Sequence, residues 1–235
     1  MLEIDIGGGR KIQLDFPGFK PQIVLIGFAV VGVLVGVLTS IYTIKPEEVG
    51  VVLRFGKYQS TQQPGLHFKA PFFIDKVEKV AVLRQQKQEY GFGTPMNTNR
   101  SQWMGPPEQE KEKKMVTGDL NAALVEWVIQ YRITKPKDYL FMVKDADITL
   151  RNASESVMRE VVGDRTVDEV ITIGRQDIER ESLEKLEVLA KKYKLGVSID
   201  QIQLKDVNPP RDVEDSFNEV NRAEQEKSTA VNVAN

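Results

Sequence analysis

A run of 24 residues without a charged side chain, residues 21–44, constrains this 235-residue chain more than any other feature. Within it, residues 23–38 hold twelve Ile, Val, Leu or Phe side chains, three glycines and one alanine, so a helix there has no polar face. A helix over all 24 residues rises roughly 36 Å, and the hydrocarbon core of a bilayer is about 30 Å thick. The run therefore predicts a single transmembrane helix. Its expected anchor residues include Pro21, Ile23, Phe28, Gly32, Gly36 and Tyr42.

Two alternatives fit this segment less well. A buried core helix or strand rarely runs so long without a charge. A cleaved signal peptide needs a basic leader and a small-residue cleavage site, but residues 1–20 carry three basic and three acidic side chains, and Leu38-Thr39-Ser40-Ile41 offers no such site. Orientation stays open, because three basic residues precede the segment and three closely follow it. Gly32 and Gly36 form a G-x-x-x-G pair, which either lets a second helix approach or reflects the abundance of glycine in membrane helices.

The composition of the chain argues against most catalytic chemistry. There is no cysteine and one histidine, so we expect no metal and no cofactor. His67 lies between Leu66 and Phe68, where a packed or surface imidazole is more common than a ligand or base. The net charge of −2 disfavours nucleic acid as a partner, and no serine-hydrolase elbow or phosphate loop is present. We expect no catalytic residue, although a Ser–Lys hydrolase has no spacing signature and stays open.

Turn signals and alternation predict a β-rich part over residues 45–90, after a polar tail at 1–20 and the anchor at 21–44. Residues 47–55, 66–68 and 76–84 are the expected strands. Phe72 and Phe73 lie in the connection between two of them, beside Pro71, and fit either the lipid interface or core packing. Residues 91–114 combine glycines, prolines and a charge run, which predicts a flexible insertion with Trp103 as a possible contact residue.

Residues 115–208 are expected to form a mixed α/β part. Alternating apolar residues predict a hairpin of 115–117 with 123–133, and a final strand at 197–207 with a bulge between Ile199 and Ile202. Between these strands we expect a helix from Pro136, a helix capped by Asp147, a short helix with a Thr166–Glu169 capping box, and a helix over 175–194 closed by Gly196.

The final segment, 209–235, begins with a helix breaker, Asn208-Pro209-Pro210, and continues with apolar residues at three- and four-residue steps. Such a seam fits the start of a coiled coil, or a surface helix that packs on a globular core.

Several segments in a fixed order resemble the SPFH family (stomatin, prohibitin, flotillin, HflK/C), also called band 7. The resemblance covers roughly residues 42–223 and is strongest for the HflK/HflC branch. It rests on residues 42–57 (YTIKPEEVGVVLRFGK), 64–68 (PGLHF), 128–133 (VIQYRI), 150–163 (LRNASESVMREVVG) and 207–210 (VNPP).

The resemblance implies an α+β protein of the bacterial inner membrane: one N-terminal transmembrane helix, a β-rich first SPFH subdomain, an α/β second subdomain and a coiled-coil helix. It implies a short cytoplasmic N-terminus and a periplasmic SPFH domain. The implied partners are the lipid bilayer, further copies of the chain, an HflC-like sister subunit and an FtsH-like membrane AAA protease enclosed in their ring or cage. The rival within the family is a free-standing scaffold of the stomatin or prohibitin type.

Two departures from the family pattern stand out. The insertion at 91–114 is longer than expected, and the chain ends at Asn235 where a relative would continue into the long helix, so either a portion is missing or the protein cannot close a cage by itself. Phe72 and Phe73 are the expected lipid-facing residues. The expected oligomer contacts are Leu150, Val157, Val161, Val213, Phe217 and Val220.

Overall fold

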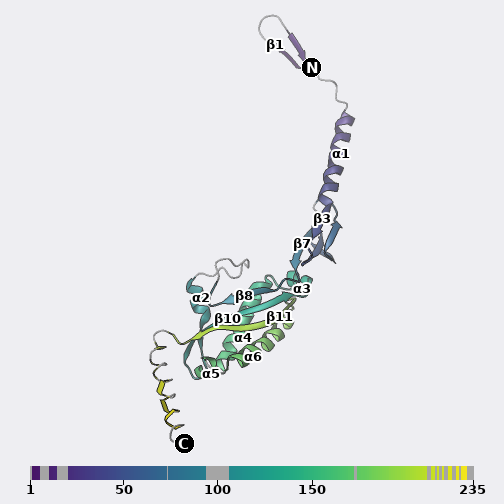
Figure 1. Cartoon of the computed structure of the whole chain (residues 1–235). Helices are drawn as coiled ribbons and strands as arrows, with labels where there is room; N and C mark the ends of the chain where they lie inside the picture. Colours follow the sequence, from purple (N-terminus) through teal and green to yellow (C-terminus); the bar gives the residue numbers. More distant parts are fainter. Residues whose placement is uncertain are drawn as a thin grey trace.

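The computed structural model describes residues 2–5, 11–14, 21–72, 74–93, 106–171 and 174–210, together with part of the segment 213–231. The described part of the molecule is elongated, with β1 and the larger α/β unit on opposite sides of α1 (Figure 1). Strands β1 (Leu2–Asp5) and β2 (Lys11–Leu14) form an antiparallel hairpin that precedes helix α1 (Pro21–Ser40). A small β unit follows α1, and a larger α/β unit follows that.

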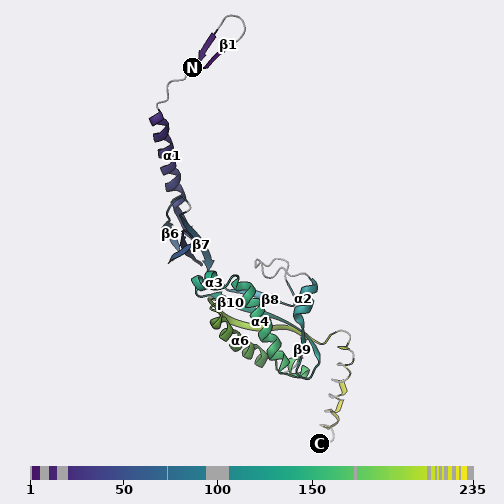
Figure 2. The ribbon, with the colours of Figure 1, turned by 180° about the vertical axis from the view of Figure 1, so that it is seen from behind.

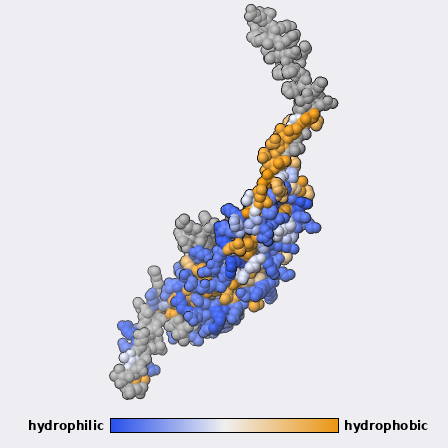
Figure 3. Space-filling model, turned by 45° about the vertical axis from the view of Figure 1, so that its right-hand side comes forward, coloured by the Kyte–Doolittle hydropathy of each residue, from blue (hydrophilic) through white to orange (hydrophobic). Residues whose placement is uncertain are grey.

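Helix α1 occupies most of the charge-free run and ends where two hydroxyl groups turn back onto its carbonyls. Ser40 Oγ donates to the Gly36 carbonyl at 2.7 Å, and Thr39 Oγ1 donates to the Val35 carbonyl at 2.9 Å. The face shown in Figure 3 is hydrophobic along α1 and largely hydrophilic over the larger unit. Within the part of the chain that the structure describes, no helix has both the length and the apolar character needed to cross a membrane. The transmembrane helix stays a prediction.

The small β unit contains a two-stranded ribbon and a three-stranded sheet over residues 41–81, whereas residues 86–90, the end of the expected β-rich part, form a strand of the larger unit. In the ribbon, β3 (Ile41–Ile44) pairs antiparallel with β6 (Gly65–Phe68). In the sheet, β4 (Glu48–Arg54) lies between β5 (Lys57–Gln62) and β7 (Asp75–Ala81). Gly50 lies in the middle of β4, where a Cβ would be 2.5 Å from the end of the Ile44 side chain, so the ribbon approaches the sheet closely at this point.

The larger unit is an antiparallel sheet with helices on one face (Figures 1 and 2). Its strands are β8 (Gln86–Tyr90), β9 (Lys114–Val116), β10 (Ala122–Ile133) and β11 (Val197–Asn208), in the order β11-β10-β8 with β9 beside the start of β10. The helices are α3 (Pro136–Phe141), α4 (Ala146–Gly163), α5 (Val167–Ile171) and α6 (Arg175–Lys192). The expected hairpin and final strand are confirmed, and the bulge falls at Asp200, where the pairing of β11 with β10 skips a residue.

The core of this unit lies between the sheet and α4 with α6. Trp127 is fully buried, stacks on the Tyr90 ring with centroids 4.5 Å apart, and donates its indole N–H to Ser154 Oγ at 3.0 Å. One stripe of α4 faces this core. Its members are Leu150, Ala153, Val157 and Val161.

Two helix boundaries differ from the sequence expectation. The N-cap of α4 is Asp145, which accepts from the Ile148 N–H at 3.1 Å, so Asp147 lies in the first turn instead. Helix α6 ends at Lys192, and the residue with positive φ that closes it is Lys194, at φ 54°. Gly196, at φ 70°, belongs to the turn that leads into β11. The Thr166–Glu169 capping box of α5 is confirmed, with the Thr166 N–H donating to Glu169 at 2.9 Å.

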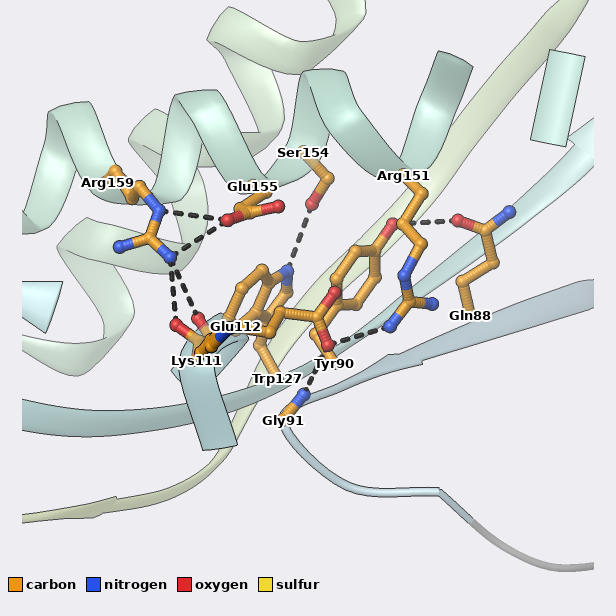
Figure 4. A network of polar contacts seen from close by, with 10 residues as sticks. All are labelled: Gln88, Tyr90, Gly91, Lys111, Glu112, Trp127, Arg151, Ser154, Glu155 and Arg159. Carbon is orange, nitrogen blue, oxygen red and sulfur yellow. Dashed lines mark hydrogen bonds and ion pairs between the residues drawn. The ribbon is translucent and has the colours of Figure 1, made fainter. Parts of the chain in front are cut away.

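The insertion expected to be a flexible loop through residue 114 is ordered over its last part. Residues Pro106–Lys113 form helix α2, and the loop expectation is wrong there. The helix is polar throughout and is held by charged groups instead of apolar contacts (Figure 4). Glu112 pairs with Arg151 of α4 at 2.7 Å, and Arg159 donates to the carbonyls of Lys111 and Lys114 at the helix end. Arginine at a helix C-terminus satisfies carbonyls that have no partner in the helix.

A second apolar cluster joins the two units. Val51, Leu53 and Val80 of the small unit pack with Ile133 of β10, and Tyr139, Leu140 and Val197 of the larger unit complete the cluster. Lys137 also lies over the Tyr58 ring at 4.8 Å. Because this cluster is shared, the small unit and the larger unit are held in one relative orientation.

Candidate membrane interface

The loop before β7 is the point where the small β unit meets α1. Phe72 packs against the helix at Gly36, where a Cβ would lie 3.3 Å from the Phe72 ring. The Lys69 N–H donates to the Ser40 carbonyl at 2.8 Å, which ties the same loop to the helix end. Gly36 therefore faces its own chain, whereas Gly32 has no atom within 4 Å of its Cβ position among the described residues. Phe73, the second expected lipid-facing residue, lies outside the described residues.

Phe55 is exposed beside this loop. The Phe55 N–H donates to the Ile74 carbonyl at 2.9 Å, so the β4–β5 turn lies next to the loop that contacts α1. Phe55 and Gly56 have φ values of 49° and 81° and form a two-residue turn between the paired residues Arg54 and Lys57. Positive φ at both central residues is the pattern of a type I′ turn, which favours Asn-Gly. Phenylalanine with positive φ is strained, yet the Phe55 side chain is 80% exposed.

The ribbon adds a third exposed apolar group at the same end. Ile41 pairs with Phe68, and Leu66 lies two residues away on the same face. All three side chains are exposed, with Phe68 at 74%. We name the whole set the α1-end patch, and it is drawn from three separate chain segments. Its members are Ile41, Phe55, Leu66, Phe68 and Phe72.

One buried carboxylate fixes the geometry of the patch. Asp75 binds the Arg54 guanidinium through both oxygens, at 2.9 and 3.1 Å, and accepts from the Ala70 N–H at 2.9 Å. The Arg54 hydrogen bond, and then the Ala70 N–H, hold the pKa of Asp75 below its ordinary value. Asp75 thus joins the turn that carries Phe55 to the loop that carries Phe72.

The expected oligomer contacts divide into two groups. Leu150, Val157 and Val161 are at most 2% exposed and belong to the core of their own unit, so the prediction that they contact another subunit is wrong. Their periodicity reflects packing of α4 on the sheet. Val213 is 48% exposed and stays available, whereas Phe217 and Val220 lie outside the described residues.

His67, the one histidine of the chain, lies in β6. His67 Nε2 lies 2.8 Å from the Gln63 carbonyl, and its ring is beside Tyr42. Among the described residues, no three His, Asp or Glu side chains gather as a metal site would require. The exposed apolar side chains of the α1-end patch continue from the hydrophobic surface of α1, so they form the candidate membrane interface.

Replacing Phe55 by asparagine is expected to raise the free energy of unfolding by about 1 kcal/mol, because Asn-Gly suits this turn and relieves the positive φ of phenylalanine. Chemical denaturation of the full chain in detergent measures the change. Phe68→Asn is the matched control: it removes an equally exposed ring from a strand without positive φ, so its stability should fall slightly. Equal effects of the two changes would show that Phe55 is not strained.

Comparisons with known proteins add a family context. Residues 42–235 match the SPFH domain / Band 7 family. The chain is 38% identical over 202 residues to Protein HflK of Treponema pallidum, covering 85% of this chain and 61% of that protein. It is 32% identical over 222 residues to the Escherichia coli protein called Modulator of FtsH protease HflK, covering 91% and 48%. Protein HflK of Borreliella burgdorferi is 30% identical over 215 residues, covering 91% and 67%. The chain thus spans about half to two thirds of the length of these relatives.

Proposed function

This chain belongs to the SPFH domain / Band 7 family, and from that membership we propose that it is a non-enzymatic, HflK-like scaffold subunit of a bacterial membrane. The observation that carries the proposal is its similarity to HflK proteins of several bacteria over most of its length. A scaffold acts by holding surfaces in place and needs no reactive group, which agrees with a chain of one histidine and no cysteine.

We propose that α1 (residues 21–40) crosses the inner membrane once, with the short N-terminus in the cytoplasm and the SPFH domain in the periplasm. Residues 41–44, which were expected in the anchor, form strand β3 of the small unit instead. The α1-end patch then lies at the lipid interface. Phe72 supports this placement, because it packs against α1 at Gly36 and is still 62% exposed. The apolar cluster shared by the two units would transmit the tilt of the small unit to the larger one, so that every subunit stands at the same angle on the membrane.

The proposed partners are an HflC-like sister subunit, further copies of this chain, and an FtsH-like AAA protease whose degradation of membrane proteins the assembly modulates. The Escherichia coli relative is named as a modulator of FtsH protease, which supports that choice. Confinement of anchored subunits to a plane raises their effective concentration, and head-to-tail contacts that close produce a ring. Val213, Phe217 and Val220, on the segment beyond β11, are the remaining candidates for contacts between subunits.

Purification of the tagged full chain from its host in mild detergent, followed by mass spectrometry, tests the proposal. We expect a large particle that contains an HflC-type subunit and an FtsH-type protease. A large particle that lacks both would favour the free-standing stomatin- or prohibitin-like scaffold instead. Labelling of the intact protein by a serine-reactive probe would revive the hydrolase alternative.

A further inference from the structure

We propose that the α1-end patch selects an anionic lipid surface, through Lys57 and Lys69 beside its exposed rings. This inference rests on the proposed placement of the patch at the lipid interface and goes beyond it, because it names the headgroup charge that the patch recognises. It follows from the balance of charges at this end of the small unit.

The charges around the patch are predominantly positive. Lys57 is exposed and directly follows Phe55 and Gly56. Its backbone is paired with that of Arg54 on the other side of the β4–β5 turn. Lys69 follows Phe68 and is held at the end of α1 by its backbone N–H. The carboxylate of Asp75 is buried and already engaged by Arg54, and the Lys76–Glu78 pair, at 2.6 Å, is neutral overall. Two lysine charges are therefore left over at the patch.

The occupant that fits this arrangement is a bilayer with anionic headgroups. Exposed apolar rings alone suit any lipid, whereas rings bordered by lysine suit a layer that presents phosphate above an apolar interior. The patch continues directly from α1, because Phe72 lies against Gly36, so the apolar rings and the proposed anchor meet the same phase. The strain at Phe55 and Phe72, with φ of 49° and 58°, indicates that these exposed rings are retained for contact.

Single-cysteine labelling provides a direct test, since the chain has no cysteine of its own. In the full chain, Leu66→Cys places a cysteine at the edge of the patch, where a polarity-sensitive fluorophore is attached. The labelled chain is then reconstituted in vesicles. Leu34→Cys on α1 carries the same label as the anchor control. The vesicles are phosphatidylcholine alone or phosphatidylcholine mixed with phosphatidylglycerol. We expect the label at residue 66 to be in lipid far more often in the mixed vesicles, and the label at residue 34 to be in lipid in both.

The charge variants determine which groups are responsible. In anionic vesicles, Lys57→Gln with Lys69→Gln should lower the ratio of lipid-inserted to water-exposed residue-66 label roughly 30-fold. This is the effect expected from the loss of two lysines near a charged surface. Lys192→Gln with Lys205→Gln removes the same number of positive charges from the larger unit and should change nothing. Inorganic phosphate at constant ionic strength should not displace the patch, and displacement would show a free-phosphate site and overturn the proposal.

The remaining outcomes separate this inference from the proposed function. A residue-66 label that is in lipid equally in both vesicles would overturn selection by charge, while the placement of the patch at the interface stands. A residue-66 label in water throughout, with the residue-34 label in lipid, would overturn the interface placement itself. An equal effect of the control pair would show that net charge, and not Lys57 with Lys69, is what the membrane senses.

Discussion

Replacing Glu112 by alanine is expected to lower the free energy of unfolding by about 3–5 kcal/mol, because it leaves the Arg151 guanidinium buried without its partner. Both side chains are 4% exposed, and their 2.7 Å contact joins α2 to α4 (Figure 4). Glu112 also accepts a hydrogen bond from the Gly91 N–H at 2.8 Å, so the same change leaves that backbone N–H without its acceptor. Burial raises the pKa of Glu112, while the Gly91 N–H and the Arg151 charge oppose that shift.

Three variants of the full chain in mild detergent test the reason for this loss. Urea denaturation followed by tryptophan fluorescence in a Trp103→Phe background reports on Trp127 alone and gives the free energy of unfolding. Trp127 stacks on the same Tyr90 ring that Arg151 covers. Glu112→Gln keeps an oxygen acceptor and should cost less than alanine. Glu112→Met with Arg151→Met removes both charges and should recover most of the stability. A loss under about 1 kcal/mol in Glu112→Ala would contradict a desolvated pair.

Local periodicity explains why so much of the fold was predictable. In β10, the alternation of Trp127, Ile129 and Tyr131 with Gln130 and Arg132 fixed one buried face, and the structure buries those three side chains completely. Helix α2 has no apolar stripe to detect. Its position depends on Glu112 meeting Arg151, which lies 39 residues further along the chain. A contact between residues so far apart in the sequence cannot be detected from the local pattern of apolar and polar residues.

The candidate site was harder to predict for the opposite reason. An apolar residue in a strand or turn is assigned to the core by default, so Phe55, Leu66 and Phe68 were missed, although Phe72 was expected. The one available signal was Phe55-Gly56 in a two-residue turn, where asparagine is the usual first residue. Leu150 and Val157 were wrongly predicted to contact another subunit, although they belong to the core of their own unit. Periodicity shows that one face of a helix is covered, but it does not show whether the same chain or a partner covers it.

Replacing Gly196 by alanine is expected to lower the free energy of unfolding by about 2–5 kcal/mol, which combines the cost of a left-handed residue with that of overpacking. Gly196 has φ of 70°, and a Cβ there would meet the Lys135 carbonyl oxygen and lie 2.7 Å from the Tyr139 nitrogen. Both obstacles are backbone atoms. They cannot yield by a rotamer change, and the Gly196 carbonyl is itself fixed by the Thr134 and Lys135 N–H groups at 2.9 Å.

Gly56→Ala separates the two contributions to that loss. Gly56 has φ of 81° but no atom within 4 Å of its Cβ position among the described residues, so alanine there should cost only about 1–2 kcal/mol. Urea denaturation of both variants in the same detergent gives the difference, which measures the backbone clash at Gly196. Val197, the next residue, packs in the cluster that joins the two units, so this clash acts on the junction between them. Equal losses in the two variants would mean that the turn into β11 opens freely and that the junction is not rigid.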